Sequence, residues 1–173
     1  MSATANQTIG PFWHGLAFPE WADLTRFGAA GERITVTGVI TDGAGEPVTD
    51  GCVEIWQSDP PASDAFPGFG RCATDPEGRF RFITVKPGPV PSQPGGNSLQ
   101  APHLAVTIFA RGLLQHVCTR FYFEGEALNE SDPLLGRLPD ADRATLVARR
   151  EGESDWRLDI RLQGEGETVF LDI

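Results

Sequence analysis

A segment rich in proline and glycine, residues 86–102, limits the folds open to this chain. It reads KPGPVPSQPGGNSLQAP and lies between two runs of β-type residues, Arg79–Val85 and His103–Arg111. Proline fixes φ and has no backbone N–H to donate, so this segment can form neither a helix nor a central strand. We therefore expect an ordered loop at the end of a β-sheet, where functional sites are commonly found.

Short β-type runs recur along the rest of the chain. Residues 34–40 largely alternate between apolar and polar, as in a half-buried strand. Further strands are expected at Cys52–Gln57, Phe69–Thr74, Val117–Phe123, Asp155–Gln163 and Thr168–Ile173. One helix is expected at Ala141–Arg150, with Asp140 as its N-cap and arginines in its last turn. The pattern predicts a mainly β fold, a β-sandwich with one short helix and long loops.

The chain is most simply one domain, because 173 residues can bury a substantial core. Residues 1–31 show neither a helical nor a strand period, yet they contain several aromatic side chains. We predict that residues 1–31 are an arm that packs on a partner or on the chain's own sheet. Residues 32–173 are predicted to form the sandwich.

The charge and cysteine content exclude several classes of function. A net charge of -10 argues against nucleic acid or an anionic membrane surface as the main partner. The three widely spaced cysteines form neither a disulfide framework nor a CxxC site. No basic, apolar leader opens the sequence and no stretch could span a bilayer, so a cytoplasmic protein is expected.

Several stretches spread over most of the chain resemble the intradiol ring-cleaving dioxygenases. They are TIGPFWHGLAF, GRCATDPEGRFRFITVKPGPVP, APHLAV, TRFYFEGEALNESDPLL and WRLDIRLQGEGETVFLDI. The resemblance implies the β-sandwich of that family, in which two tyrosines and two histidines hold a non-haem ferric ion. It also implies pairing, because two-chain members of the family combine an α-type chain with a homologous β-type chain.

Most of the iron ligands that this resemblance implies are missing from the sequence. Ferric iron prefers anionic oxygen and imidazole ligands, and Tyr122 is the single tyrosine of the chain. Val90 stands where one ligand tyrosine is expected, and the loop expected to supply the other contains Phe66 instead. His103 matches the first histidine of an HxH pair, but Ala105 replaces the second. We therefore expect Fe3+ to be held by the β-type partner and not by this chain.

The resemblance gives a substrate-binding role to two other features. Thr8, Gly10 and Pro11 match a T-x-G-P-Y segment that reaches the partner's active-site cleft, whereas Phe12 lacks the tyrosine hydroxyl. Arg111, in the run FARG, matches an arginine that lines the same cleft. A guanidinium suits the carboxylate of protocatechuate (3,4-dihydroxybenzoate). From the residues alone, a plain N-terminal arm and a surface ion pair are the simpler alternatives.

The resemblance implies an α-type, non-metal subunit that is inactive alone and lines the partner's ferric site. The reaction implied is intradiol cleavage of protocatechuate by O2 to 3-carboxy-cis,cis-muconate, in aromatic-compound catabolism through the β-ketoadipate pathway, within a higher hetero-oligomer. The alternative is a stand-alone, non-catalytic β-sandwich binding module derived from the same fold. The single tyrosine argues against a third possibility, an active single-chain dioxygenase.

Overall fold

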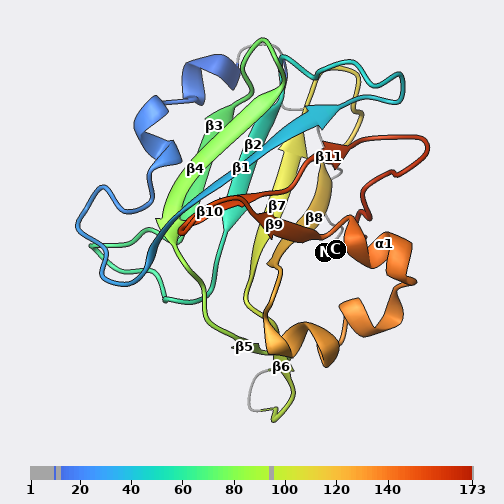
Figure 1. The fold of residues 1–173 in the computed structure, drawn as a ribbon. Helices are drawn as coiled ribbons and strands as arrows, with labels where there is room; N and C mark the ends of the chain where they lie inside the picture. The colour runs from blue at the N-terminus through green and yellow to red at the C-terminus, as the bar shows by residue number, and fades with distance from the viewer. Residues whose placement is uncertain (1–9, 11–12, 94–95, 173) are drawn as a thin grey trace, which may run out of the picture.

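The computed structural model describes residues 10, 13–93 and 96–172 (Figure 1). Its strands are β1 (Arg33–Thr41), β2 (Cys52–Trp56), β3 (Phe69–Ala73), β4 (Arg79–Val85), β5 (Val90–Pro91), β6 (Leu99–Gln100), β7 (His103–Phe109), β8 (Val117–Phe123), β9 (Val147–Arg150), β10 (Asp155–Arg157) and β11 (Ile160–Arg161). Its helices are the 3-10 turns η1 (Trp13–Leu16), η2 (Pro19–Ala22), η3 (Ala127–Glu130) and η4 (Leu135–Arg137), and the α-helix α1 (Asp140–Ala144).

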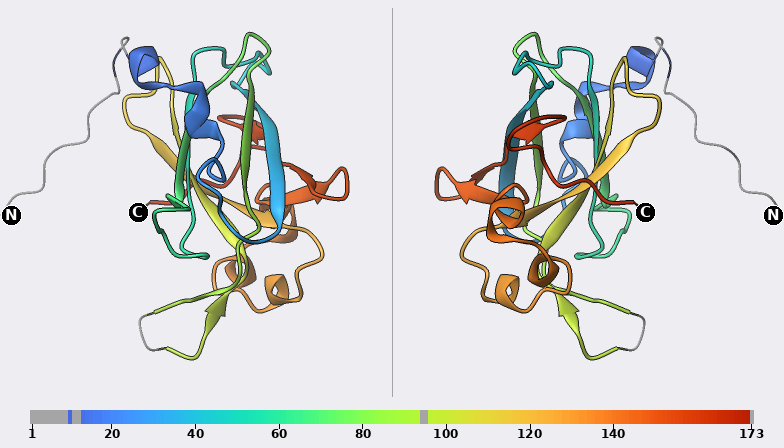
Figure 2. Two further views of the ribbon diagram at one scale, coloured as in Figure 1. Left: turned by 90° about the vertical axis from the view of Figure 1, so that its left-hand side faces the viewer. Right: turned by 90° about the vertical axis from the view of Figure 1, so that its right-hand side faces the viewer.

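The strands form two layers that face each other (Figure 2). In one layer β1 pairs antiparallel with β4 along one edge and in parallel with β10 and β11 along the other. The second layer has the order β3-β2-β7-β8. Strand β9 joins the layers, because it pairs with both β10 and β8. This arrangement confirms the predicted β-sandwich.

The core between the layers follows from the alternation of side chains along the strands. In β1 every second residue is buried, and the buried set includes Ile34 and Val36. Gly38 belongs to the same buried set. A Cβ at this position would lie 2.0 Å from the carbonyl oxygen of Leu158, so a larger residue does not fit. Glycine at this position therefore allows the β10–β11 connection to lie directly against β1.

The proline- and glycine-rich segment forms no part of the main sheet, as expected. Val90 pairs with Gln100, so β5 and β6 make a separate two-stranded sheet that projects from one end of the sandwich (Figure 1). The projecting segment leaves β4 and returns to β7, and it therefore brings residues 87–90 close to the start of β7.

The predicted helix Ala141–Arg150 is wrong in its second half. The helix α1 ends at Ala144, and β9 follows after two residues. Phe123 of β8 is paired with Ala148, which is completely buried. Sheet pairing with a strand distant in sequence thus overrides the local helix signals. Asp140 is the first helical residue and not the N-cap; the N-cap is Pro139, which has no side-chain hydrogen bond.

The C-terminal strands are also shorter than expected. The run Asp155–Gln163 divides into β10 and β11, and Thr168–Asp172 contributes a single bridge, in which the Leu171 N–H donates to the Cys118 carbonyl at 2.7 Å. Among the described residues, no helix is long and apolar enough to span a membrane.

Residues 13–31 of the arm lie on the chain's own sandwich. Leu24 is completely buried, and its N–H donates to the carbonyl of Ile83 in β4 at 2.8 Å. Trp13 is buried as well. The division between residues 1–31 and 32–173 stays a prediction, since the start of the arm lies outside the described residues.

Candidate functional site

Three of the positions where the resemblance implies iron ligands line one small cavity. Val90 comes from β5, whereas His103 and Ala105 come from the start of β7, on the same face of that strand. Together they line a cavity of about 110 Å³, and its other lining residues are Trp56 and the loop residues Gln57, Ser58, Asp59, Pro87 and Gly88. The segments on either side of the projecting hairpin therefore line the same cavity.

His103 is a partly buried residue with a defined tautomer. Its Nδ1 lies 2.7 Å from the carbonyl oxygen of Ala101, which can only accept, so Nδ1 carries the proton and Nε2 the lone pair. Burial lowers the pKa of His103 below its usual 6.5, against opposing effects of the Ala101 hydrogen bond and the Asp132 charge. The imidazole is therefore neutral at pH 7.

Stability is expected to fall as the pH drops below about 6.5, because of His103. The folded-state pKa is lowered, so the unfolded chain takes up the proton first as the pH falls. The stabilising contribution is thus complete above the unfolded pKa and is lost as the pH falls through the folded one. Urea unfolding between about pH 7 and pH 5 measures this, and His103→Gln should flatten the slope. An unchanged slope in the variant would contradict the assignment.

The single tyrosine is a core residue in this structure. Tyr122 is completely buried, its hydroxyl donates to Asp132 Oδ1 at 3.1 Å, and it accepts from Arg120 Nη1 at 2.8 Å. Burial raises the pKa of Tyr122, so the phenol stays protonated at neutral pH. Its oxygen is occupied by these two partners and is therefore unsuited to serve as a phenolate ligand.

Asp132 was not identified from the sequence, although its carboxylate holds the backbone just before β7 in place. It is almost fully buried and accepts the backbone N–H groups of Ala101 at 2.8 Å, Leu134 at 2.9 Å and Leu135 at 3.1 Å. Its Asp-Pro dipeptide is a turn signal that could have drawn attention to it. Its link to Tyr122 and Ala101 depends on tertiary structure.

The donor set of the small cavity does not fit a ferric ion. Val90 and Ala105 offer no side-chain donor atom, which leaves His103, one carboxylate (Asp59) and the neutral oxygens of Gln57 and Ser58. Asp59 already accepts the N–H of Gly88 at 2.7 Å, and the side-chain oxygen of Gln57 accepts the hydroxyl of Thr84 at 2.6 Å. Within residues 10, 13–93 and 96–172, no three His, Cys, Asp or Glu residues cluster as metal ligands. A hard cation that prefers several anionic oxygens finds no such set here.

Arg111 lies at the opposite end of the sandwich from the small cavity. It comes two residues after Phe109, the last residue of β7, whereas His103 is the first. Its side chain is 88% exposed, and its Nε lies 3.0 Å from Asp50 Oδ2. Gly112 beside it has a φ of 91°, which favours glycine in this turn.

The described part of the N-terminal arm approaches the same end. The β7–β8 connection and η1 both lie there (Figures 1 and 2). Gly10, just before η1, is half-buried with a φ of 77°, and a Cβ there would meet nothing within 4 Å. Thr8, Pro11 and Phe12 lie outside the described residues, so the structure brings together only part of the expected substrate-binding set.

Comparisons with known proteins relate the chain to dioxygenases. Residues 23–164 match the family model described as Dioxygenase. The chain is 39% identical to the protocatechuate 3,4-dioxygenase alpha chain of Pseudomonas putida, over 98% of this chain and 96% of that protein. It is 35% identical to the protocatechuate 3,4-dioxygenase beta chain of Burkholderia cepacia, over 80% of this chain and 67% of that one.

A solved structure extends the likeness to the fold. The dioxygenase domain of a dioxygenase–carbohydrate-binding protein fusion from Streptomyces sp. SirexAA-E matches with a TM-score of 0.66 and 25% identity, over 97% of this chain and all of that one. The nearly closed β-sandwich is thus a dioxygenase fold. The chain belongs to the intradiol dioxygenase family, which is iron-dependent, and the resemblance seen in its sequence is confirmed.

Proposed function

We propose that this chain is the α-type subunit of a protocatechuate 3,4-dioxygenase and contributes no iron ligand. The observation that carries the proposal is a cavity with His103 but without a second imidazole or a phenolate, in a chain similar to an alpha chain over nearly its whole length. A family member without metal ligands of its own can contribute to catalysis if a partner chain supplies those ligands. The similarity to a beta chain supports a homologous partner of that kind.

In this proposal the β-type chain holds Fe3+ through its tyrosine and histidine ligands, and both chains form a higher hetero-oligomer in the cytoplasm. Protocatechuate and O2 react there to give 3-carboxy-cis,cis-muconate. This chain completes the partner's cleft with Thr8, Gly10, Pro11, Phe12 and Arg111. The guanidinium of Arg111 is 88% exposed and, among the described residues, is held by Asp50 through its Nε, so it is accessible to a carboxylate, which supports this role.

Co-expression with a β-type chain tests the proposal. We expect the two chains to co-purify at a fixed ratio and to consume O2 with protocatechuate, whereas this chain alone stays inactive. A chain that remains monomeric in the presence of the partner would contradict the proposal and favour a stand-alone binding module. Ring cleavage by this chain alone would contradict it as well.

A further inference from the structure

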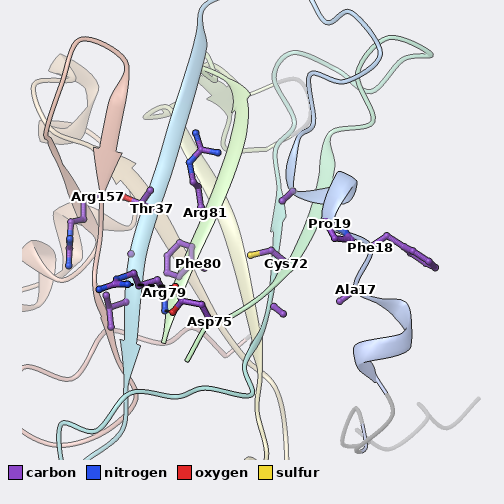
Figure 3. A pocket seen from close by; sticks show the side chains of 14 residues that line it. Ala17, Phe18, Pro19, Thr37, Cys72, Asp75, Arg79, Phe80, Arg81 and Arg157 are labelled. Carbon is purple, nitrogen blue, oxygen red and sulfur yellow. Dashed lines mark hydrogen bonds and ion pairs between the residues drawn. The ribbon is translucent and has the colours of Figure 1, made fainter. Parts of the chain in front are cut away.

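A second and larger cavity, of about 490 Å³, lies between the segment 17–22 and the strands β1, β3 and β4. It shares no lining residue with the small cavity at His103. Figure 3 shows the segment Ala17–Pro19 on one side, β1 and β4 with Phe80 on the other, and the side chain of Cys72 between them. Cavities of this volume commonly bind small molecules.

Much of the lining of this cavity is apolar. Ala17 and Pro19 lie on one side and Phe80 on the other, and Ala22 is also part of the lining. Burial raises the pKa of the Cys72 thiol to about 12, so this side chain is uncharged at neutral pH. These side chains can make apolar contacts with an aromatic ring, but they provide no partner for a charged group.

The rim carries three arginines, and two of them are already paired. Arg79 lies 3.3 Å from Glu77 and 3.8 Å from Asp75. Arg157 lies 3.0 Å from Asp159. The carboxylates that face these two guanidinium groups offset their charge, so neither is a strong attractant for a further anion.

Arg81 is the unpaired cation of the rim. Its side chain is exposed and lies on the same face of β4 as Arg79, two residues away. Within the part of the chain that the structure describes, no carboxylate lies at ion-pair distance from Arg81. One free guanidinium beside apolar walls matches one negative charge, and Asp75 in the lining repels a ligand with several.

We propose that this cavity binds a small aromatic monocarboxylate, with its carboxylate on Arg81 and its ring against Pro19 and Ala22. The guanidinium offers parallel N–H donors to the two carboxylate oxygens. The ring gains by leaving water for the apolar walls. The proposal does not depend on the proposed enzymatic function, because every element of the cavity belongs to this chain.

The test uses this chain purified alone, without iron or partner, titrated with benzoate and with benzamide as the uncharged isostere. Backbone amide shifts in NMR report where each ligand binds. We expect benzoate to bind with a Kd of about 1 mM, as suits so small a ligand, and to shift amides of residues 17–22 and β4. Benzamide is expected to bind about tenfold more weakly, because it lacks the charge.

Two variants and one matched control sharpen the result. Arg81→Gln should weaken benzoate binding about tenfold, and Val39→Trp should block it by filling the cavity. Arg149→Gln, an exposed arginine that lines a different cavity, should leave binding unchanged. The proposal is overturned if benzoate shifts none of these amides up to about 10 mM, if benzamide binds equally well, or if Arg81→Gln binds like the unaltered chain.

Discussion

Replacing Arg111 with alanine is expected to lower kcat/KM for protocatechuate by about 100-fold in the complex with the β-type chain. In the proposed function, Arg111 makes a charge-assisted contact with the substrate carboxylate in the partner's cleft, and such contacts are stronger there than in water, so its loss is costly. The assay is initial-rate O2 uptake over a range of protocatechuate concentrations. A rise in KM with little change in kcat would indicate that Arg111 acts mainly in binding.

Two further variants separate this role from a plain surface ion pair. Arg111→Lys keeps the charge but loses the planar fork, so it should fall between the native residue and alanine. Arg137→Ala removes an exposed arginine from η4 and should leave kcat/KM unchanged. If Arg111→Ala behaves like Arg137→Ala, the contact with Asp50 is all that Arg111 provides, and its place in the cleft is refuted.

Replacing Asp132 with alanine is expected to lower the free energy of unfolding by about 4 kcal/mol. The carboxylate accepts hydrogen bonds from the Tyr122 hydroxyl and from backbone N–H groups at both the entry to β7 and η4. Removing it leaves these buried donors unpaired, and an unpaired buried donor is costly. Urea unfolding, followed by tryptophan fluorescence, measures the change.

Matched substitutions show whether the hydrogen bonds of Asp132 are the cause. Asp140→Ala removes an exposed carboxylate from the first turn of α1 and should cost less than about 1 kcal/mol. Tyr122→Phe removes only one of the donors and should cost about 1 kcal/mol. An Asp132→Ala variant as stable as Asp140→Ala would show that the network adds little to the fold.

Local patterns in the sequence predicted much of the fold. Alternation identified β1, and the dense prolines correctly kept residues 86–102 out of the main sheet. The failure at Val147–Arg150 has a physical cause, because this segment becomes a strand only through its pairing with β8 and β10. Local propensity contains no information about those partners.

The site could be predicted only in part. The resemblance pointed to Val90, His103 and Ala105, and the structure brings these three side chains to one cavity. The role of Asp132 depends on the fold around His103 and Tyr122, which are paired across β7 and β8. The larger cavity could not be predicted either, since it forms where residues 17–22 lie beside strands distant in sequence.

The most direct measurement is the iron content and visible spectrum of this chain, purified alone and in complex with the β-type chain. The lone chain should be colourless and free of iron, and the complex should contain about one iron per pair of chains, with the absorption band of tyrosinate bound to ferric iron. Stoichiometric iron with that band in the lone chain would contradict the central claim, because Tyr122 would then have to leave Asp132 and bind the metal.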